Sequence, residues 1–246
     1  MPASGRPVYL AYQWLWSGLD LLYPPDCGGC GRRGVRWCQA CQEAAVRVLP
    51  PLCERCGQEL KQPGLCESCQ AAPPHFIAVR SWAVFEGPIR QALHRLKYRR
   101  DLSLGEILSR PLVGLLEELG WPVDLVVPVP LGVARLHERG YNQATLLARP
   151  LALGCGCSFR PQALSRVRET RSQVGLSIAQ RRENVSGAFQ AGAGWVSGRN
   201  VLVVDDVATS SATLDACASA LLGAGAAQVF GMTLARARHK ESGAHT

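Results

Sequence analysis

The sequence predicts an α/β protein in which a parallel sheet with helices on both faces follows a small cysteine-rich N-terminal domain. Three observations support this fold class. Apolar and β-branched runs alternate with runs of helical spacing over residues 76–234, which is typical of a parallel sheet. The run at residues 201–204 ends in two carboxylates and a hydroxyl-rich loop, and four C-x-x-C pairs precede the sheet at residues 27–69.

Composition limits the classes of protein to consider. The chain has 246 residues, of which 47% are hydrophobic, enough for one medium-sized core and a small second domain. The formal net charge of +8 suits a polyanionic partner but is also common in soluble enzymes. No apolar run is long enough for a membrane span, and the N-terminus lacks the pattern of a signal peptide. We therefore expect a cytoplasmic protein whose eleven cysteines do not form disulfides.

An amphipathic helix is expected at residues 10–22. Its large apolar side chains share one face at helical spacing: Leu10, Trp14, Leu15, Leu19 and Leu22. Because polar residues interrupt the run, this face is expected to dock on the protein rather than on a membrane.

The C-x-x-C pairs are the strongest signal in the sequence. Gaps of seven, eleven and nine residues separate them, and their members are Cys27, Cys30, Cys38, Cys41, Cys53, Cys56, Cys66 and Cys69. One C-x-x-C turn places two thiolates on a metal, and two turns complete a tetrahedral Cys₄ site. Redox motifs do not explain four pairs in series, and the spacing fits no iron–sulfur cluster. We therefore predict two structural zinc ions that supply folding energy to a segment poor in large apolar residues.

Sequential pairing of the C-x-x-C turns is the simplest arrangement, and interleaved pairing remains open. Gly31 and Gly57 each follow the second cysteine of a pair and are expected to take positive φ. The predicted domains are residues 1–72, with the N-terminal helix and the double ribbon, and residues 73–246, with the α/β sheet.

The elements of the second domain follow from local patterns. Gly87 and Pro88 begin a helix, since proline is favoured in the first turn, and Gly120 ends the next helix. A short edge strand is expected at residues 157–163. The other predicted strands are residues 76–85, 123–129, 187–190, 201–204 and 227–234, and the other predicted helices are residues 102–119, 143–153 and 214–224.

The most informative stretch is residues 201–214. A buried strand is followed by Asp205 and Asp206, and a loop of small residues then leads into a helix. Free backbone N–H groups and the positive end of the helix dipole then face one point, which suits a phosphate. Two carboxylates beside such a site are expected to bind sugar hydroxyls or a divalent metal. The stretch therefore predicts a site for a ribose phosphate. For the Asp-Asp pair by itself, a turn with two solvated aspartates is the alternative.

The stretch resembles the phosphoribosyl pyrophosphate (PRPP) signature of type I phosphoribosyltransferases, a hydrophobic run followed by D-D-x-x-T-T-G-x-T. The resemblance implies that Asp205 and Asp206 hold the ribose hydroxyls, that Mg²⁺ accompanies PRPP, and that the loop holds the 5′-phosphate. The loop residues are Ala208, Thr209, Ser210, Ser211, Ala212 and Thr213. Ser211 stands where the signature has glycine, and a side chain there is expected to cost about 1 kcal/mol. PRPP binding and turnover are therefore expected to be weaker than in that family.

Further strings extend the resemblance over nearly the whole chain. These strings are Pro128-Val-Pro130, Arg139-Gly-Tyr-Asn-Gln143, Arg168…Thr170…Gln173 and Arg182-Glu-Asn-Val185. Together with the cysteine pairs, the set resembles the ComF competence family, also called ComFC. The resemblance implies a cytoplasmic role in natural transformation, in which the protein handles incoming single-stranded DNA beside the helicase ComFA.

Basic residues at two places are candidates for DNA contacts. One set ends the helix near residue 98, where it could equally complement the helix dipole. The other lies in residues 166–185, which are interpreted either as a mobile loop over the site or as a solvated surface loop. Because only 7% of residues are aromatic, phosphate contacts are expected to outweigh base stacking. The candidates are Lys97, Arg99, Arg100, Arg168, Arg171, Arg181 and Arg182.

Three functions therefore fit the sequence. The first is a DNA-handling protein with a ribose 5-phosphate or PRPP site. The second is an active phosphoribosyltransferase, in which Mg²⁺ and the loop hold pyrophosphate as the leaving group. The third is an interaction module whose zinc ribbon docks a protein partner. The sequence identifies no phosphoribosyl acceptor and no catalytic residue.

Overall fold

The computed structural model describes residues 7–170 and 177–238, and its centre is a five-stranded sheet. All neighbouring strands are parallel, in the order β1-β7-β6-β2-β3. The strands are β1 (Val79–Val84), β2 (Leu125–Pro128), β3 (Ser158–Phe159), β6 (Asn200–Ala208) and β7 (Gln228–Arg236). The predicted parallel α/β fold is confirmed.

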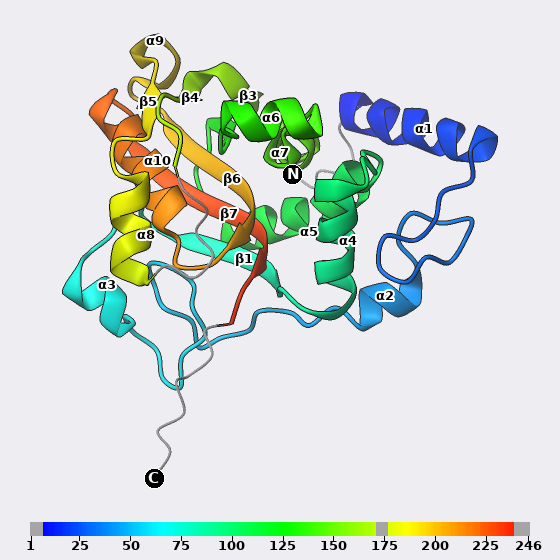
Figure 1. The fold of residues 1–246 in the computed structure, drawn as a ribbon, viewed down its shortest axis with the longest axis horizontal. Coiled ribbons are helices and arrows are strands. Elements are labelled where there is room, and N and C mark those ends of the chain that lie inside the picture. Colours follow the sequence, from blue (N-terminus) through cyan, green and yellow to red (C-terminus); the bar gives the residue numbers. More distant parts are fainter. Residues whose placement is uncertain (1–6, 171–176, 239–246) are drawn as a thin grey trace.

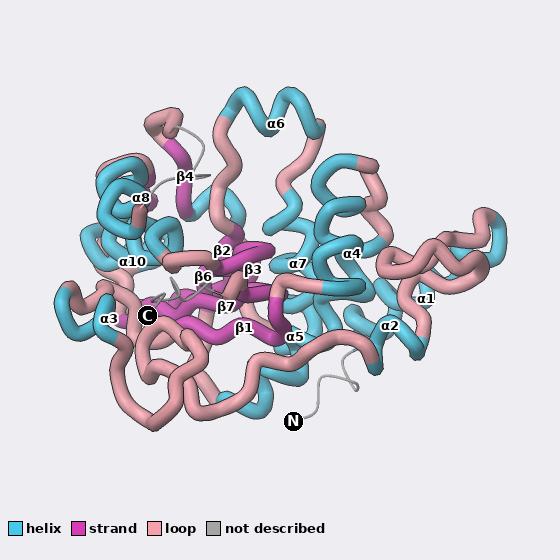
Figure 2. Tube along the Cα trace, turned by 60° about the horizontal axis from the view of Figure 1, so that its bottom comes forward, coloured by secondary structure: helices cyan, strands magenta, loops and turns pink. Residues whose placement is uncertain are grey.

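Helices cover both faces of this sheet (Figure 1, Figure 2). One face carries α4 (Gly87–Tyr98), α5 (Leu104–Leu119) and α7 (Gln143–Cys155), and the other carries α8 (Ile178–Val185) and α10 (Ala212–Gly223). Side chains of β6 alternate between the two cores, with Leu202 and Val204 in the first and Val201 and Val203 in the second. Burial on both faces explains why β6 reads as a continuous apolar run.

Most predicted elements occur at the expected places. Gly120 ends α5 in a left-handed conformation with φ 60°, and β3 pairs only with β2 among the described strands, as an edge strand should. The predicted strand near residue 189 exists as β5 (Phe189–Ala191), but it pairs antiparallel with β4 (Leu164–Arg166) outside the main sheet. Strand β6 runs four residues beyond Val204, because β7 pairs with it as far as Ala208.

Several short helices were not predicted. The basic segment interpreted as a loop contains α8, which Ser177 and Gln180 begin with a reciprocal capping box. The others are α2 (Gln39–Glu43), α3 (Glu67–Ala71), α6 (Val133–Arg139), the 3₁₀ helix at Pro161–Ala163 and α9 (Ala193–Val196). None of the helices in residues 7–170 and 177–238 is long and apolar enough to cross a bilayer.

The N-terminal helix α1 (Pro7–Leu22) lies at one edge of the molecule (Figure 1). The prediction that its large apolar side chains form the face that docks on the protein is wrong. The five large apolar residues expected to dock are exposed, from 37% at Leu10 to 78% at Trp14. The docked face carries Tyr9, which is 4% exposed, and Asp20. Asp20 turns inward because an arginine from the first ribbon meets it there.

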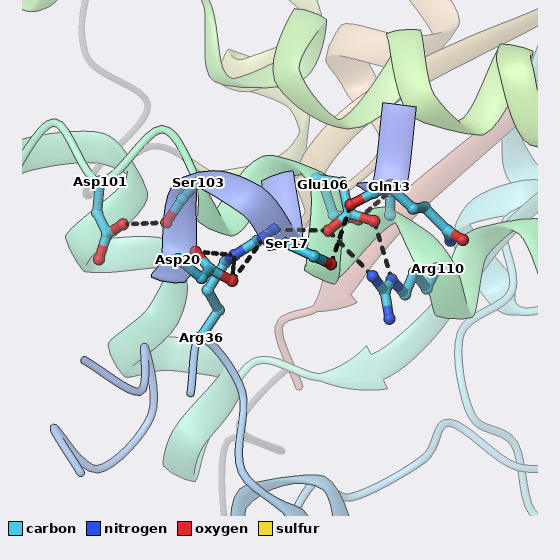
Figure 3. Close-up of polar contacts among 9 residues, drawn as sticks. Gln13, Ser17, Asp20, Arg36, Asp101, Ser103, Glu106 and Arg110 are labelled. Carbon is cyan, nitrogen blue, oxygen red and sulfur yellow. Dashed lines mark hydrogen bonds and ion pairs between the residues drawn. The ribbon is translucent and has the colours of Figure 1, made fainter. Parts of the chain in front are cut away.

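That arginine, Arg36, joins three parts of the chain (Figure 3). Its guanidinium pairs with Asp20 of α1 at 2.7 Å and with the buried Glu106 of α5 at 2.8 Å. Arg110 holds the other oxygen of Glu106 at 2.9 Å. A buried carboxylate with two cationic partners is compensated, so this cluster fixes α1 and the first ribbon against the α/β domain.

Candidate functional site

The eight ribbon cysteines form two separate clusters. Cys27, Cys30, Cys38 and Cys41 make the first, and Cys53, Cys56, Cys66 and Cys69 make the second; within each, the sulfur atoms all lie within 4.8 Å of one another. The structure therefore has the sequential arrangement of C-x-x-C turns. Gly31 and Gly57 take φ values of 78° and 73°, as predicted.

Both clusters fit zinc. Four sulfurs bound tetrahedrally at about 2.3 Å from a zinc ion lie about 3.8 Å apart, and the pairs Cys27–Cys41 and Cys56–Cys66 are separated by 3.6 and 3.7 Å. Burial opposes ionisation, but backbone N–H groups lower the pKa of Cys27 and of Cys53 to about 6. Burial and neighbouring thiols raise the pKa of Cys41. A dication would favour the thiolate form of all four ligands.

The other cysteines have no place in these clusters. Cys217 is fully buried, as expected for a small hydrophobic residue. Cys155 and Cys157 are half-buried.

Residues 208–213 run from the end of β6 through the connecting loop to the first turn of α10; this segment, predicted to hold the phosphate, is called the phosphate loop. Ser211 precedes the first turn of α10 with φ 61° and ψ 9°, which is a left-handed conformation. This is the region that glycine adopts without cost, so the loop keeps the shape that a glycine would give it. The Ser211 side chain is 5% exposed and its Oγ lies 3.5 Å from Nη1 of Arg236. A side chain at this position is therefore held at a positive φ, which is unfavourable for residues other than glycine.

The carboxylate pair precedes the phosphate loop and has a cationic partner that the sequence did not indicate. Nζ of Lys97, from the last turn of α4, forms an ion pair with Asp206. Gln143, at the start of α7, donates to Asp206 at 3.3 Å and accepts from Arg139 at 2.8 Å. Side chains of α4, α7 and β6, which are distant in sequence, therefore contact one another near the carboxyl end of β6.

Burial acts on the two aspartates in different ways. Burial and the charge of Asp206 raise the pKa of Asp205 well above its usual value. Burial alone would also raise the pKa of Asp206, but the Lys97 ammonium outweighs it and lowers that pKa. The Lys97 ammonium therefore favours the ionised form of Asp206, whereas burial favours the protonated form of Asp205.

A cleft of about 590 Å³ lies over these groups. This volume is in the range of pockets that hold a nucleotide-sized ligand. From the phosphate loop, Ala208, Thr209, Ser211, Ala212 and Thr213 line it, whereas Ser210 lines a small cavity on the ribbon side of the loop. The basic side chains that line the cleft are Lys97, Arg135, Arg139, Arg166 and Arg181, and the acidic ones are Glu138, Asp205 and Asp206.

The residues predicted to contact DNA lie in three kinds of place. Lys97 and Arg181 line the cleft, and Arg99 and Arg100 are exposed just beyond α4. Two others are engaged with backbone carbonyls: Arg168 donates to the oxygens of Asn184 and Ser186, and Arg182 approaches Ser68 and Ala72 of the second ribbon. Arg171 and Gln173 lie outside the described residues.

Sequence reasoning missed Arg135, Arg139, Arg166 and Gln143 as members of the site. Arg139 and Gln143 belong to a string that follows β2, and the carboxyl ends of parallel strands are where such sheets bind ligands. Their place after a strand was therefore a usable signal. Arg135 lies in the unpredicted helix α6, and no comparable signal marks it.

The fold and the clusters define a class: a double zinc ribbon joined to a parallel α/β domain with a phosphate loop. Residues 18–70 match the family described as double zinc ribbon domain. The chain is 35% identical over 198 residues to "DNA utilization protein YhgH" of Salmonella typhi, covering 78% of this chain and 86% of that protein. It is 31% identical over 209 residues to "Competence protein F" of Haemophilus influenzae, covering 80% and 90%.

A third relative, "Competence protein ComFC" of Bacillus subtilis, is 25% identical over 230 residues, covering 90% of this chain and 89% of that protein. The chain belongs to the ComF family. Among solved structures, an adenine phosphoribosyltransferase is 19% identical with a TM-score of 0.37, covering 57% of this chain and 81% of that one.

Proposed function

We propose that this chain handles single-stranded DNA during competence or DNA utilization, and that its cleft binds a ribose 5-phosphate such as PRPP. The names of the relatives support the first part. One observation carries the second: the cleft combines the phosphate loop at the start of α10 with the Asp205–Asp206 pair and five basic side chains.

The parts of the cleft suit different parts of a ribose phosphate. Backbone N–H groups at the start of α10 and the hydroxyls of Thr209 and Thr213 are donors for the 5′-phosphate. Asp205 and Asp206 offer acceptors to the ribose hydroxyls. The lining arginines neutralise further phosphate charge, and Mg²⁺ bound with PRPP would share oxygen ligands with the same carboxylates. DNA phosphates would meet the exposed Arg99 and Arg100 outside the cleft.

Ribose 5-phosphate tests the cleft directly. Calorimetry with the zinc-loaded protein is expected to show binding that the variant Asp205→Asn/Asp206→Asn weakens by about tenfold or more, since charged acceptors are lost. The matched ligand 2-deoxyribose 5-phosphate lacks one hydroxyl and is expected to bind wild-type protein more weakly. Equal affinity of wild type and variant would refute the assignment of the carboxylates.

Salt dependence tests the DNA part. For single strands, the slope of log affinity against log salt changes by about 0.7 for each phosphate contact. The variant Arg99→Ala/Arg100→Ala is therefore expected to flatten the slope by about 1.4. Arg199→Ala is the control, because this exposed arginine lies beside the amino end of β6, opposite the cleft. A slope changed equally by both variants, or by neither, would refute this DNA surface.

An active phosphoribosyltransferase is the second candidate, and the conformation of Ser211 favours it. The loop has the left-handed shape at the position where the signature has glycine. Release of pyrophosphate from PRPP, measured with and without single-stranded DNA, separates the two functions. Turnover would assign an enzyme, and binding without release would assign a ribose phosphate sensor or clamp.

A further inference from the structure

The second ribbon lies directly against the phosphate loop. Cys56, Cys66 and Cys69 line a small cavity together with Ser210, Ser211 and Ala212 of the loop. The cavity has room of about 20 Å³, which is no more than one water molecule needs. The first turn of α10 is also held from this side, because Asp215 accepts a hydrogen bond from the backbone N–H of His75 at 2.6 Å.

One buried arginine spans the gap between the cluster and the loop. Arg236, the last residue of β7, is 4% exposed. Its Nη1 donates to the carbonyl oxygen of Cys56 at 2.6 Å and lies 3.5 Å from Oγ of Ser211. Its Nε is buried with no partner among the described protein atoms.

A buried guanidinium needs a nearby negative charge. A zinc ion with four thiolate ligands carries a net charge of −2, so the second cluster supplies one.

We propose that Arg236 is a positioning residue through which the second zinc cluster holds the phosphate loop in its binding shape. The proposal rests on the proposed function of the cleft. Arg236 keeps Ser211 in the left-handed conformation from behind the loop, so zinc binding at the second cluster and phosphate binding in the cleft stabilise each other.

The first cluster provides an internal comparison. Arg95 donates to the carbonyl oxygen of Cys27 at 2.9 Å, as Arg236 does to Cys56. Arg95, however, pairs with Asp101 at 2.8 Å, and the described cysteines that line the small cavity beside the phosphate loop all belong to the second cluster. The first zinc is therefore expected to be independent of the phosphate loop.

Thermodynamic linkage makes the coupling measurable from both ends. If the second zinc strengthens ribose 5-phosphate binding, ribose 5-phosphate must hold that zinc more tightly by the same factor. Ribose 5-phosphate should then slow the release of only one of the two zinc equivalents to a chelator. General stabilisation of the fold would protect both.

The experiment uses zinc-loaded full-length protein, a colorimetric zinc chelator and ribose 5-phosphate as the probe. Arg236→Met is expected to weaken the binding of ribose 5-phosphate by about tenfold. This variant should still bind both zinc equivalents and should have an unchanged circular dichroism spectrum. Arg236→Lys, which keeps the charge, should recover part of the affinity. The matched control Arg95→Met should change affinity less than about twofold. In wild type, saturating ligand should slow the release of one zinc equivalent, and Arg236→Met should abolish that protection.

Other outcomes overturn one proposal or the other. Wild-type affinity in Arg236→Met, or protection of both zinc equivalents or of neither, would refute the coupling. If wild type binds no ribose 5-phosphate, the proposed function of the cleft fails. The link between Arg236 and the second cluster is then tested by the rate of zinc release to the chelator. Arg236→Met should speed the release of one zinc equivalent and not of the other. Equal release of both equivalents would refute the link.

Discussion

Replacing Lys97 by methionine tests the central ion pair of the cleft. Asp206 is 4% exposed, and the Lys97 side chain is 21% exposed. Methionine keeps the apolar stem of lysine and removes only the ammonium. The variant leaves a buried carboxylate that still accepts a hydrogen bond from Gln143, at 3.3 Å.

The expected loss is about 3 kcal/mol at pH 8. Removing one partner of a buried ion pair costs about 3–5 kcal/mol, and the partial exposure of Lys97 places this pair at the lower end. For a chain of this size, 1 kcal/mol corresponds to about 2–4 °C in Tm. A Tm lowered by about 6–12 °C is therefore expected.

The pH dependence has a definite sign. In wild type, the lowered pKa of Asp206 contributes stability above its unfolded pKa of about 3.9, and this stability is lost as pH falls through the folded pKa. In Lys97→Met, burial raises that pKa instead, so the penalty is present at high pH and disappears on protonation. The difference between wild type and variant should therefore be larger at about pH 8 than at about pH 5.5.

Thermal and urea unfolding of the zinc-loaded proteins at both pH values provide the measurement. The control Arg238→Met breaks an exposed pair with Glu59, whose side chains are 53% and 36% exposed, and should cost less than about 1 kcal/mol. Lys97→Met/Asp206→Asn should recover most of the stability, since no unpaired charge remains. A loss below about 1 kcal/mol at pH 8, or one that grows on acidification, would show that the pair is not buried as described.

Two further predictions concern the metal and the second aspartate. Elemental analysis should find about two zinc per chain, and one equivalent, or iron, would contradict the two Cys₄ sites. Asp205→Asn should raise stability at pH 8, because burial disfavours the charged carboxylate, while weakening ribose 5-phosphate binding. The raised folded pKa of Asp205 contributes stability that is present below about pH 3.9 and lost as pH rises through the folded pKa. The gain, read from urea midpoints, should therefore shrink on acidification, and a gain independent of pH would contradict this reasoning.

The sequence was sufficient where the cause of structure is local. Apolar runs locate the strands, and Gly120 ends α5 in the left-handed conformation that glycine adopts readily. The C-x-x-C spacing predicts that two turns share each metal, whereas the sequential pairing is established by the structure. The shape of the phosphate loop also follows from a local pattern, since a strand, a small loop and a helix must meet at one point.

The remainder depends on contacts between distant residues. Lys97 lies in the last turn of a helix, where a basic residue usually complements the dipole, and its partner Asp206 is far along the chain. The docked face of α1 depends on Arg36, which pairs with both Asp20 and Glu106, although the apolar pattern favoured the opposite face. Helix α8 has too few apolar residues to form a stripe, and only its capping box marked it.

The second ribbon shows most clearly why local reading was incomplete. This ribbon shares a core with the sheet, because Cys53 and its partners belong to one buried group with Val79, Val203 and Leu214. A parallel sheet must be covered on both faces, and the described helices on this face are few. The ribbon covers edge strand β1 instead. The backbone N–H of Val79 donates to the carbonyl oxygen of Arg55 at 2.7 Å. The backbones are so close that a Cβ on Gly57 would lie 2.4 Å from the carbonyl oxygen of Val79.

This arrangement assigns different physical roles to the two zinc ions. The first cluster is attached to the α/β domain through side chains, mainly Arg36 and Arg95. The second replaces part of the covering layer of the sheet, and the same contacts bring it behind the phosphate loop. An element that completes the core is packed against the strands whose carboxyl ends carry the ligand site. If the cleft binds a ribose phosphate as proposed, the metal of the second ribbon is therefore expected to influence that binding without lining the cleft.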